Sequence, residues 1–135
     1  RARIDGLRAP HRGLPPLRVL YQIETGPSYT VNGHSPISEV IRLCGGQNVF
    51  AGLPVLSGPV SDEALLAAAP EVVLHSELRD DRIARFWARF PRSAPMRNHA
   101  IFGIDGDLLT RSGPRLAEGA GQVCATLDQV RATRR

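Results

Sequence analysis

The stretch from Gly33 to Phe50 limits the possible folds most, because its residues predict a short helix with both ends marked. Ser35 lies in an N-cap position and Pro36 at the first helical residue, where the missing N–H costs nothing. An apolar stripe at helical spacing follows, made of Ile37, Val40, Ile41 and Cys44. Two consecutive glycines then end the helix, since glycine accepts the left-handed conformation that closes helix C-termini. The sequence therefore predicts an amphipathic helix from Ser35 to Cys44 that buries a cysteine.

Apolar runs and amphipathic segments alternate along the rest of the chain. Buried strands are predicted at Leu17–Ile23, Glu71–His75 and His99–Ile104. Further helices are predicted at Asp62–Ala69 with Ser61 as N-cap, at Asp80–Phe90, and from about Pro114 to Arg131. This alternation predicts an α/β fold of three layers, in which a mainly parallel sheet has helices on both faces.

Two segments in the first half of the chain are predicted to be mostly irregular, without a helix. The segment Glu24–His34 is predicted to be a long loop after the first strand, which is where an open α/β sheet usually binds a ligand. Tyr29 lies in this loop, and an aromatic ring there would offer a large apolar contact at little entropic cost. The alternative is that Tyr29 packs against its own loop. Asn48–Leu56 is predicted to be irregular, with a short strand at Pro54–Leu56.

Length and charge narrow the class of protein. A chain of 135 residues predicts one domain, and no apolar run approaches the length of a membrane helix. All 17 basic residues are arginine and the net charge is +4, which alone could suggest nucleic-acid binding. However, eight of the arginines lie near the two ends of the sequence, the middle is mixed in sign, and no aromatic residues alternate with these terminal arginines to form a stacking platform. We therefore expect no nucleic-acid partner.

The residues also argue against an enzyme and against a metal site. The four histidines, at positions 11, 34, 75 and 99, have no spacing that resembles a metal site. The chain has no nucleophile elbow, no phosphate-binding loop and no dinucleotide fingerprint. Asp105 and Asp107 lie two residues apart after a predicted strand, where a solvated turn is the better interpretation than a metal site.

Two cysteines alone leave the redox compartment open, and two buried, unbonded thiols would suit a cytosolic protein. Three segments, however, carry a resemblance: Gly33–Phe50, Val60–Leu74 and Ile104–Arg131. Together they resemble the C-terminal lobe of a periplasmic solute-binding protein, and most of all the cobalamin-binding proteins of ABC uptake systems. The resemblance covers almost the whole chain from Leu17 onward.

The resemblance implies an architecture and a function. Residues 1–16 would be the end of an interlobe helix and a linker, and residues 17–135 the C-terminal ligand-binding lobe of a two-lobe receptor. The ligand would be cobalamin or a related corrinoid, held in the cleft between the lobes, with no cofactor. The receptor would be a periplasmic monomer that docks on the ABC permease and touches the membrane complex only peripherally. Cys44 and Cys124 would form a disulfide, as the two corresponding cysteines of the relatives do.

The resemblance also implies roles for single residues. Tyr29 stands where the family places an aromatic residue against its corrinoid, and Thr30 follows it. Asp107 and Leu108 match positions that face the cleft, although relatives can carry a tryptophan where Leu108 stands. Glu63 matches the glutamate that each lobe offers to arginines of the permease, while an acidic residue in a first helical turn also stabilises a helix by itself.

Two alternatives remain open from the sequence. The receptor could bind haem or a ferric siderophore in place of a corrinoid. A protein of another class, a small α/β enzyme or regulatory domain, would lack both a periplasmic signal and a preceding homologous lobe in the parent gene.

Overall fold

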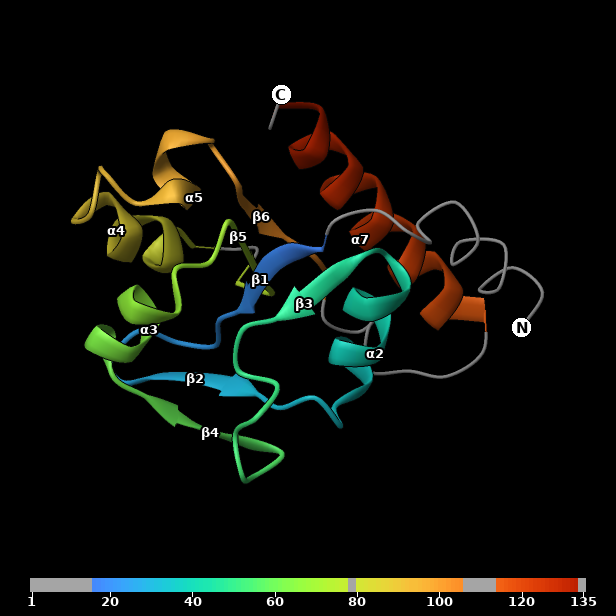
Figure 1. Cartoon of the computed structure of the whole chain (residues 1–135), viewed down its shortest axis with the longest axis horizontal. Helices are drawn as coiled ribbons and strands as arrows, with labels where there is room; N and C mark the ends of the chain where they lie inside the picture. The colour runs from blue at the N-terminus through green and yellow to red at the C-terminus, as the bar shows by residue number, and fades with distance from the viewer. Residues whose placement is uncertain (1–15, 78–79, 106–113, 134–135) are drawn as a thin grey trace.

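A computed structural model of the chain describes residues 16–77, 80–105 and 114–133. Its centre is a four-stranded parallel sheet with strand order β3-β1-β5-β6 (Figure 1). The strands are β1 (Leu17–Tyr21), β3 (Gly46–Asn48), β5 (Val72–His75) and β6 (Ile101–Gly103). In the middle of the sheet, Val19 of β1 aligns with Asn48 of β3 and with Val72 of β5. The parallel sheet confirms the predicted fold class.

Helices cover both faces of this sheet, as the strand–helix alternation predicts (Figure 1). Successive residues of β1 point to opposite faces, so Val19 and Leu20 belong to two different hydrophobic clusters. The Val19 cluster is covered by α2 (Pro36–Leu43) and α7 (Pro114–Thr133). The Leu20 cluster is covered by α3 (Asp62–Ala68), α4 (Arg82–Ala88) and α5 (Ala94–Arg97).

Helix α2 begins and ends where the sequence predicts. The Ser35 side chain accepts a hydrogen bond of 3.2 Å from the Ile37 amide, and Pro36 is the first helical residue. Cys44 is the C-cap, and Gly45 adopts a left-handed φ of 81°. Ser61 caps α3 in the same way, accepting a hydrogen bond of 3.0 Å from the Ala64 amide.

The segment predicted as a long loop contains a strand, which corrects the prediction for Glu24–His34. There, β2 (Ser28–Val31) pairs antiparallel with β4 (Ser57–Val60) in a separate two-stranded sheet. The short strand predicted at Pro54–Leu56 is also wrong, because those residues form a bend and pairing starts at Ser57, opposite Val31. Glycine and proline in β4 conceal the strand, because both are rare in strand interiors.

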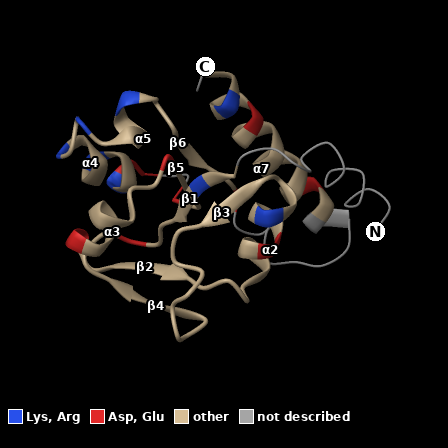
Figure 2. Cartoon of the chain, in the orientation of Figure 1, with Lys and Arg blue, Asp and Glu red and all other residues tan. Residues whose placement is uncertain are grey.

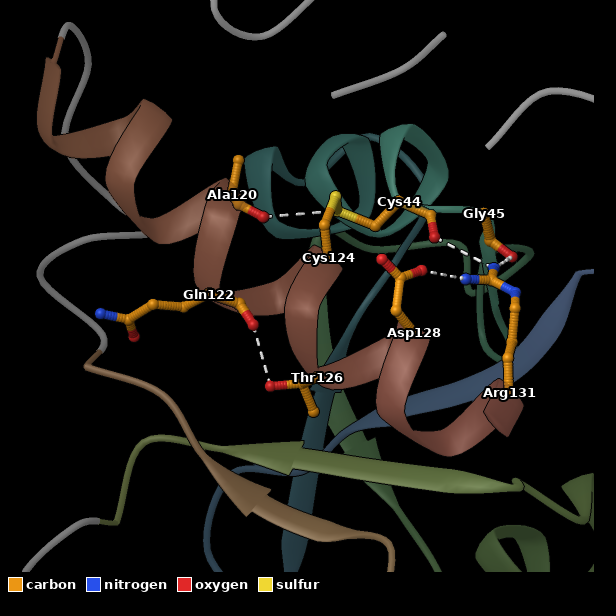
Figure 3. The surroundings of a disulfide bond; sticks show 8 residues. All are labelled: Cys44, Gly45, Ala120, Gln122, Cys124, Thr126, Asp128 and Arg131. Carbon is orange, nitrogen blue, oxygen red and sulfur yellow. Dashed lines mark hydrogen bonds and ion pairs between the residues drawn. A yellow bond between two sulfur atoms is a disulfide. The ribbon is translucent and has the colours of Figure 1, made fainter. Parts of the chain in front are cut away.

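A disulfide joins the two helices on one face of the sheet (Figure 3). Cys44 at the end of α2 and Cys124 in α7 are both buried, and their Cα atoms lie 4.7 Å apart. The pairing that the resemblance implies is therefore present. Beside it, the Arg131 guanidinium donates hydrogen bonds to the carbonyl oxygens of Cys44 and Gly45, at 3.0 and 2.6 Å. Arg131 thus provides a partner for the Cys44 carbonyl at the end of α2, while the Gly45 carbonyl also accepts a hydrogen bond of 3.1 Å from the Leu17 amide.

Candidate functional site

The carboxyl ends of the parallel strands define the candidate ligand surface. Strands β1, β5 and β6 run in the same direction, so their last residues, Tyr21, His75 and Gly103, meet at one edge. The chain leaves β1 at this edge and returns at once as β2, which carries Tyr29. In open α/β sheets, ligands bind at this edge.

Tyr29 presents an aromatic side chain on the surface from a fixed backbone. It is 39% exposed, although most large apolar side chains of the described residues are buried. Its backbone exchanges two hydrogen bonds with Ile23, at 2.6 and 2.8 Å, and it pairs with Pro59 of β4. The ring therefore has little backbone freedom to lose when a flat ligand binds.

Thr30, the next residue, points the other way. It is completely buried, and its hydroxyl donates a hydrogen bond of 2.8 Å to the carbonyl oxygen of Tyr21. In this arrangement Thr30 fastens β2 to the end of β1, and Tyr29 is the residue of the pair that faces outward. This alternation follows from the strand geometry of β2, a segment for which the sequence predicts a loop.

A buried polar chain behind Tyr29 was not predicted from the sequence. The Gln22 side chain donates a hydrogen bond of 3.0 Å to the Ser28 hydroxyl and accepts one of 2.7 Å from the Trp87 indole N–H. Gln22, Ser28 and Trp87 are all completely buried. These hydrogen bonds connect α4 to Ser28, the first residue of β2, which directly precedes Tyr29. A glutamine at the end of an apolar strand was the available sequence signal, because buried polar groups need partners.

Charged and titratable side chains lie at the same edge. Arg82 forms ion pairs with Glu24, in the β1–β2 connection, and with Asp80 at 3.0 Å. Hydrogen bonds from the Arg82 backbone and side chain lower the pKa of Asp80. Burial lowers the pKa of His75, whose Nδ1 accepts a hydrogen bond of 3.0 Å from the Glu77 amide.

Burial also affects the tyrosine at the end of β1. It raises the pKa of Tyr21, whose hydroxyl donates a hydrogen bond of 3.2 Å to the Ser76 hydroxyl. Together with the Arg82 ion pairs, this gives the edge a mixture of aromatic, hydroxyl and paired charged groups.

Two of the predicted ligand residues, Asp107 and Leu108, lie outside the described residues. Glu63 is exposed in the first turn of α3. Its neighbour Asp62 forms an ion pair with Arg89 at 3.3 Å, whereas Glu63 has no ion pair within the described part of the chain. The structure therefore leaves the Glu63 carboxylate available at the surface.

The described residues include no candidate metal site and no candidate membrane-spanning helix. Among the described residues, no three histidine, cysteine, aspartate or glutamate side chains gather closely enough to hold a metal ion. None of the described helices has the length and apolar character that crossing a bilayer requires.

Comparison with known proteins gives the same architecture. No protein-family profile matches the chain. The vitamin B12-binding protein of Vibrio parahaemolyticus is 31% identical over 99% of this chain and 49% of its own length. The crystal structure of the periplasmic vitamin B12 binding protein BtuF of Vibrio cholerae superposes with a TM-score of 0.84 at 32% identity. That match covers 96% of this chain and 51% of BtuF.

The chain is homologous to one lobe of the vitamin B12-binding proteins. It spans about half the length of the relatives it matches, as the resemblance to a C-terminal lobe predicts. The periplasmic heme-binding protein RhuT from Roseiflexus sp. RS-1 also superposes, with a TM-score of 0.80 over 96% of this chain and 52% of RhuT. Its sequence identity is only 20%, so this likeness shows a shared fold.

Proposed function

We propose that residues 17–135 are the C-terminal ligand-binding lobe of a periplasmic receptor that delivers cobalamin or a related corrinoid to an ABC importer. The observation that carries this proposal is the match to vitamin B12-binding proteins, which extends over nearly the whole chain in both sequence and fold. The heme-binding RhuT has the same fold at much lower identity. Residues 1–16 are the proposed end of the interlobe connection and, except for Pro16, lie outside the described residues.

The proposed ligand contacts lie at the carboxyl edge of the sheet. Tyr29 would lie against the flat corrinoid, where its ring adds apolar contact area. Thr30 would act from inside by holding β2 on β1, and Asp107 and Leu108 would complete this wall of the cleft. In this function the chain binds and releases its ligand unchanged, so the receptor is neither an enzyme nor a nucleic-acid-binding protein. It would act as a monomer without a cofactor.

Glu63 is the proposed contact with the permease. Its carboxylate is exposed, and the adjacent Asp62 is already paired with Arg89. An exposed carboxylate on a rigid, capped helix can meet an arginine of a partner without first breaking an internal ion pair.

Calorimetry and absorption spectroscopy test the function. The two-lobe receptor should bind cyanocobalamin with submicromolar affinity, and the 135-residue chain alone should bind weakly or not at all. A single lobe supplies one wall of the cleft, so a large part of the buried ligand area is missing. Submicromolar binding by the 135-residue chain alone would contradict the proposal that the ligand is held between two lobes. A haem absorption spectrum of the receptor purified from its host would contradict the proposal that the ligand is a corrinoid.

A further inference from the structure

The helices α3, α4 and α5 lie on the same side of the sheet (Figure 1). Residues from the C-terminal ends of α3 and α4 and from the short helix α5 line a pocket. Its volume is about 560 Å³, a size typical of small-molecule sites. Most of its wall is apolar and is formed by Leu66, Pro70, Trp87, Phe90, Pro91 and Pro95. The pocket can therefore remove a sizeable apolar group from water.

The charged residues of this pocket are all of one sign. Arg92 and Arg97 line it, and none of its described lining residues is acidic. Both arginines are exposed, and neither guanidinium forms an ion pair or hydrogen bond with a described residue. By contrast, each arginine of α4 and its C-cap pairs with a carboxylate; these arginines are Arg82, Arg85 and Arg89. Figure 2 shows basic positions on α5 and at the end of α4.

The pocket is separate from the candidate ligand surface. Pro70 directly precedes the β5 region, and α5 precedes β6, so the pocket lies toward the amino ends of these strands. Tyr29 follows the carboxyl end of β1, which runs parallel to β5. A molecule in the pocket would therefore not occupy the proposed corrinoid site.

We propose that this pocket is a second binding site, which takes a monomeric amphiphilic carboxylate such as a fatty acid. The hydrocarbon chain would lie against Leu66 and Phe90, with Trp87 buried behind them, and the carboxylate would face Arg92 and Arg97. Arginine fits this task because its planar guanidinium donates two parallel hydrogen bonds to a carboxylate. The charge complementarity and the apolar wall each favour this class of ligand, and together they exclude a strongly cationic or fully polar one.

The test uses the intrinsic fluorescence of Trp87, the single tryptophan of the chain and part of the pocket wall. Titrating the 135-residue chain with octanoate should give a saturable change, and 1-octanol should bind less tightly. The double variant R92Q/R97Q should lower octanoate affinity by roughly fivefold, the size expected for two exposed ion pairs, and leave 1-octanol affinity unchanged. The control R42Q/R85Q loses the same charge outside the pocket and should bind octanoate normally.

A third variant distinguishes binding inside the pocket from a general effect of protein charge on octanoate binding. Ala94 lines the pocket, so Ala94→Leu should narrow it and weaken binding of both octanoate and 1-octanol, while thermal unfolding shows that the variant is folded. Absence of a saturable signal at millimolar octanoate would overturn the proposal. Equal weakening by R92Q/R97Q and R42Q/R85Q, or unchanged binding by a folded Ala94→Leu variant, would overturn it as well.

Discussion

Gln22 shows how one buried side chain can fix the position of another residue on the surface. It lies at the end of β1, with Trp87 on one side of its amide and Ser28 on the other. Ser28 begins the strand that carries Tyr29. Because these three buried side chains are hydrogen-bonded to one another, burying them costs little free energy. Removing one of them leaves a buried polar group without a partner, which costs much more.

Trp87→Phe should therefore lower the free energy of unfolding by about 2–4 kcal/mol, from the smaller ring and from the Gln22 oxygen left without its donor. Urea unfolding measures this change. Trp87→Phe combined with Gln22→Leu should be less destabilising than the sum of the two single variants, because the unpaired oxygen is then gone. Additive effects would show that the hydrogen bond contributes nothing.

His75 predicts a dependence of stability on pH. Burial lowers its pKa in the folded protein, so the unfolded chain binds the proton more readily. Stability should therefore fall as pH decreases below about 6.5, the ordinary histidine pKa. His75→Asn keeps an acceptor for the Glu77 amide and does not titrate. Urea unfolding at pH 7.5 and 5.5 should show a smaller decrease for this variant, and an equal decrease would assign the effect to other groups.

At the level of elements, the sequence predicts the capped helices better than the small antiparallel sheet. Helix caps depend on a few local residues, so Ser35 and Ser61 mark α2 and α3 correctly. Pairing of β2 with β4 is a contact between segments far apart in sequence, and β4 contains Gly58 and Pro59. The outward position of Tyr29 and the burial of Thr30 could not be predicted without that pairing.

Ser61→Ala tests the cap of the helix that carries Glu63. The variant loses the acceptor for the Ala64 amide and should be less stable by about 0.5–2 kcal/mol. Ser61→Gly is the matched control, since glycine at an N-cap costs only a few tenths of a kcal/mol. Urea unfolding of both variants gives the comparison, and equal stability of the Ala variant and the parent chain would contradict a stabilising cap.

At the scale of the whole molecule, the lobe has two functional surfaces in the proposed receptor: a cleft wall at the carboxyl edge and a docking contact on α3. The comparisons show similarity over nearly the whole chain to about half of the vitamin B12-binding proteins, whereas the roles of single residues are implied by the family resemblance alone. The apolar pocket beside α5 could not be predicted, because its lining residues are distant in sequence and each has an ordinary role in a helix or turn.

Glu63→Arg tests the docking contact in the two-lobe receptor. The variant should fold and bind cyanocobalamin normally but transport it more slowly, because like charges would then face the permease. Uptake by cells and calorimetry on the purified receptor measure the two effects separately. Glu39→Arg, at an exposed position of α2, is the control for charge reversal and should leave transport unchanged. Weaker ligand binding by Glu63→Arg with normal transport of bound ligand would place Glu63 in the cleft instead.

The disulfide connects the two helices that cover one face of the sheet, and its removal should affect the whole lobe. Cys44 and Cys124 are 80 residues apart, so the bridge restricts a large part of the unfolded chain. Replacing both with alanine should lower the free energy of unfolding by about 2–4 kcal/mol, below the chain-entropy limit of about 4.5 kcal/mol for such a loop. Unfolding of the parent chain under reducing conditions should show a similar loss, and intact mass should rise by about two protons on reduction. If both thiols of unreduced, periplasmically expressed protein react freely with an alkylating reagent, the bridge does not form in that compartment.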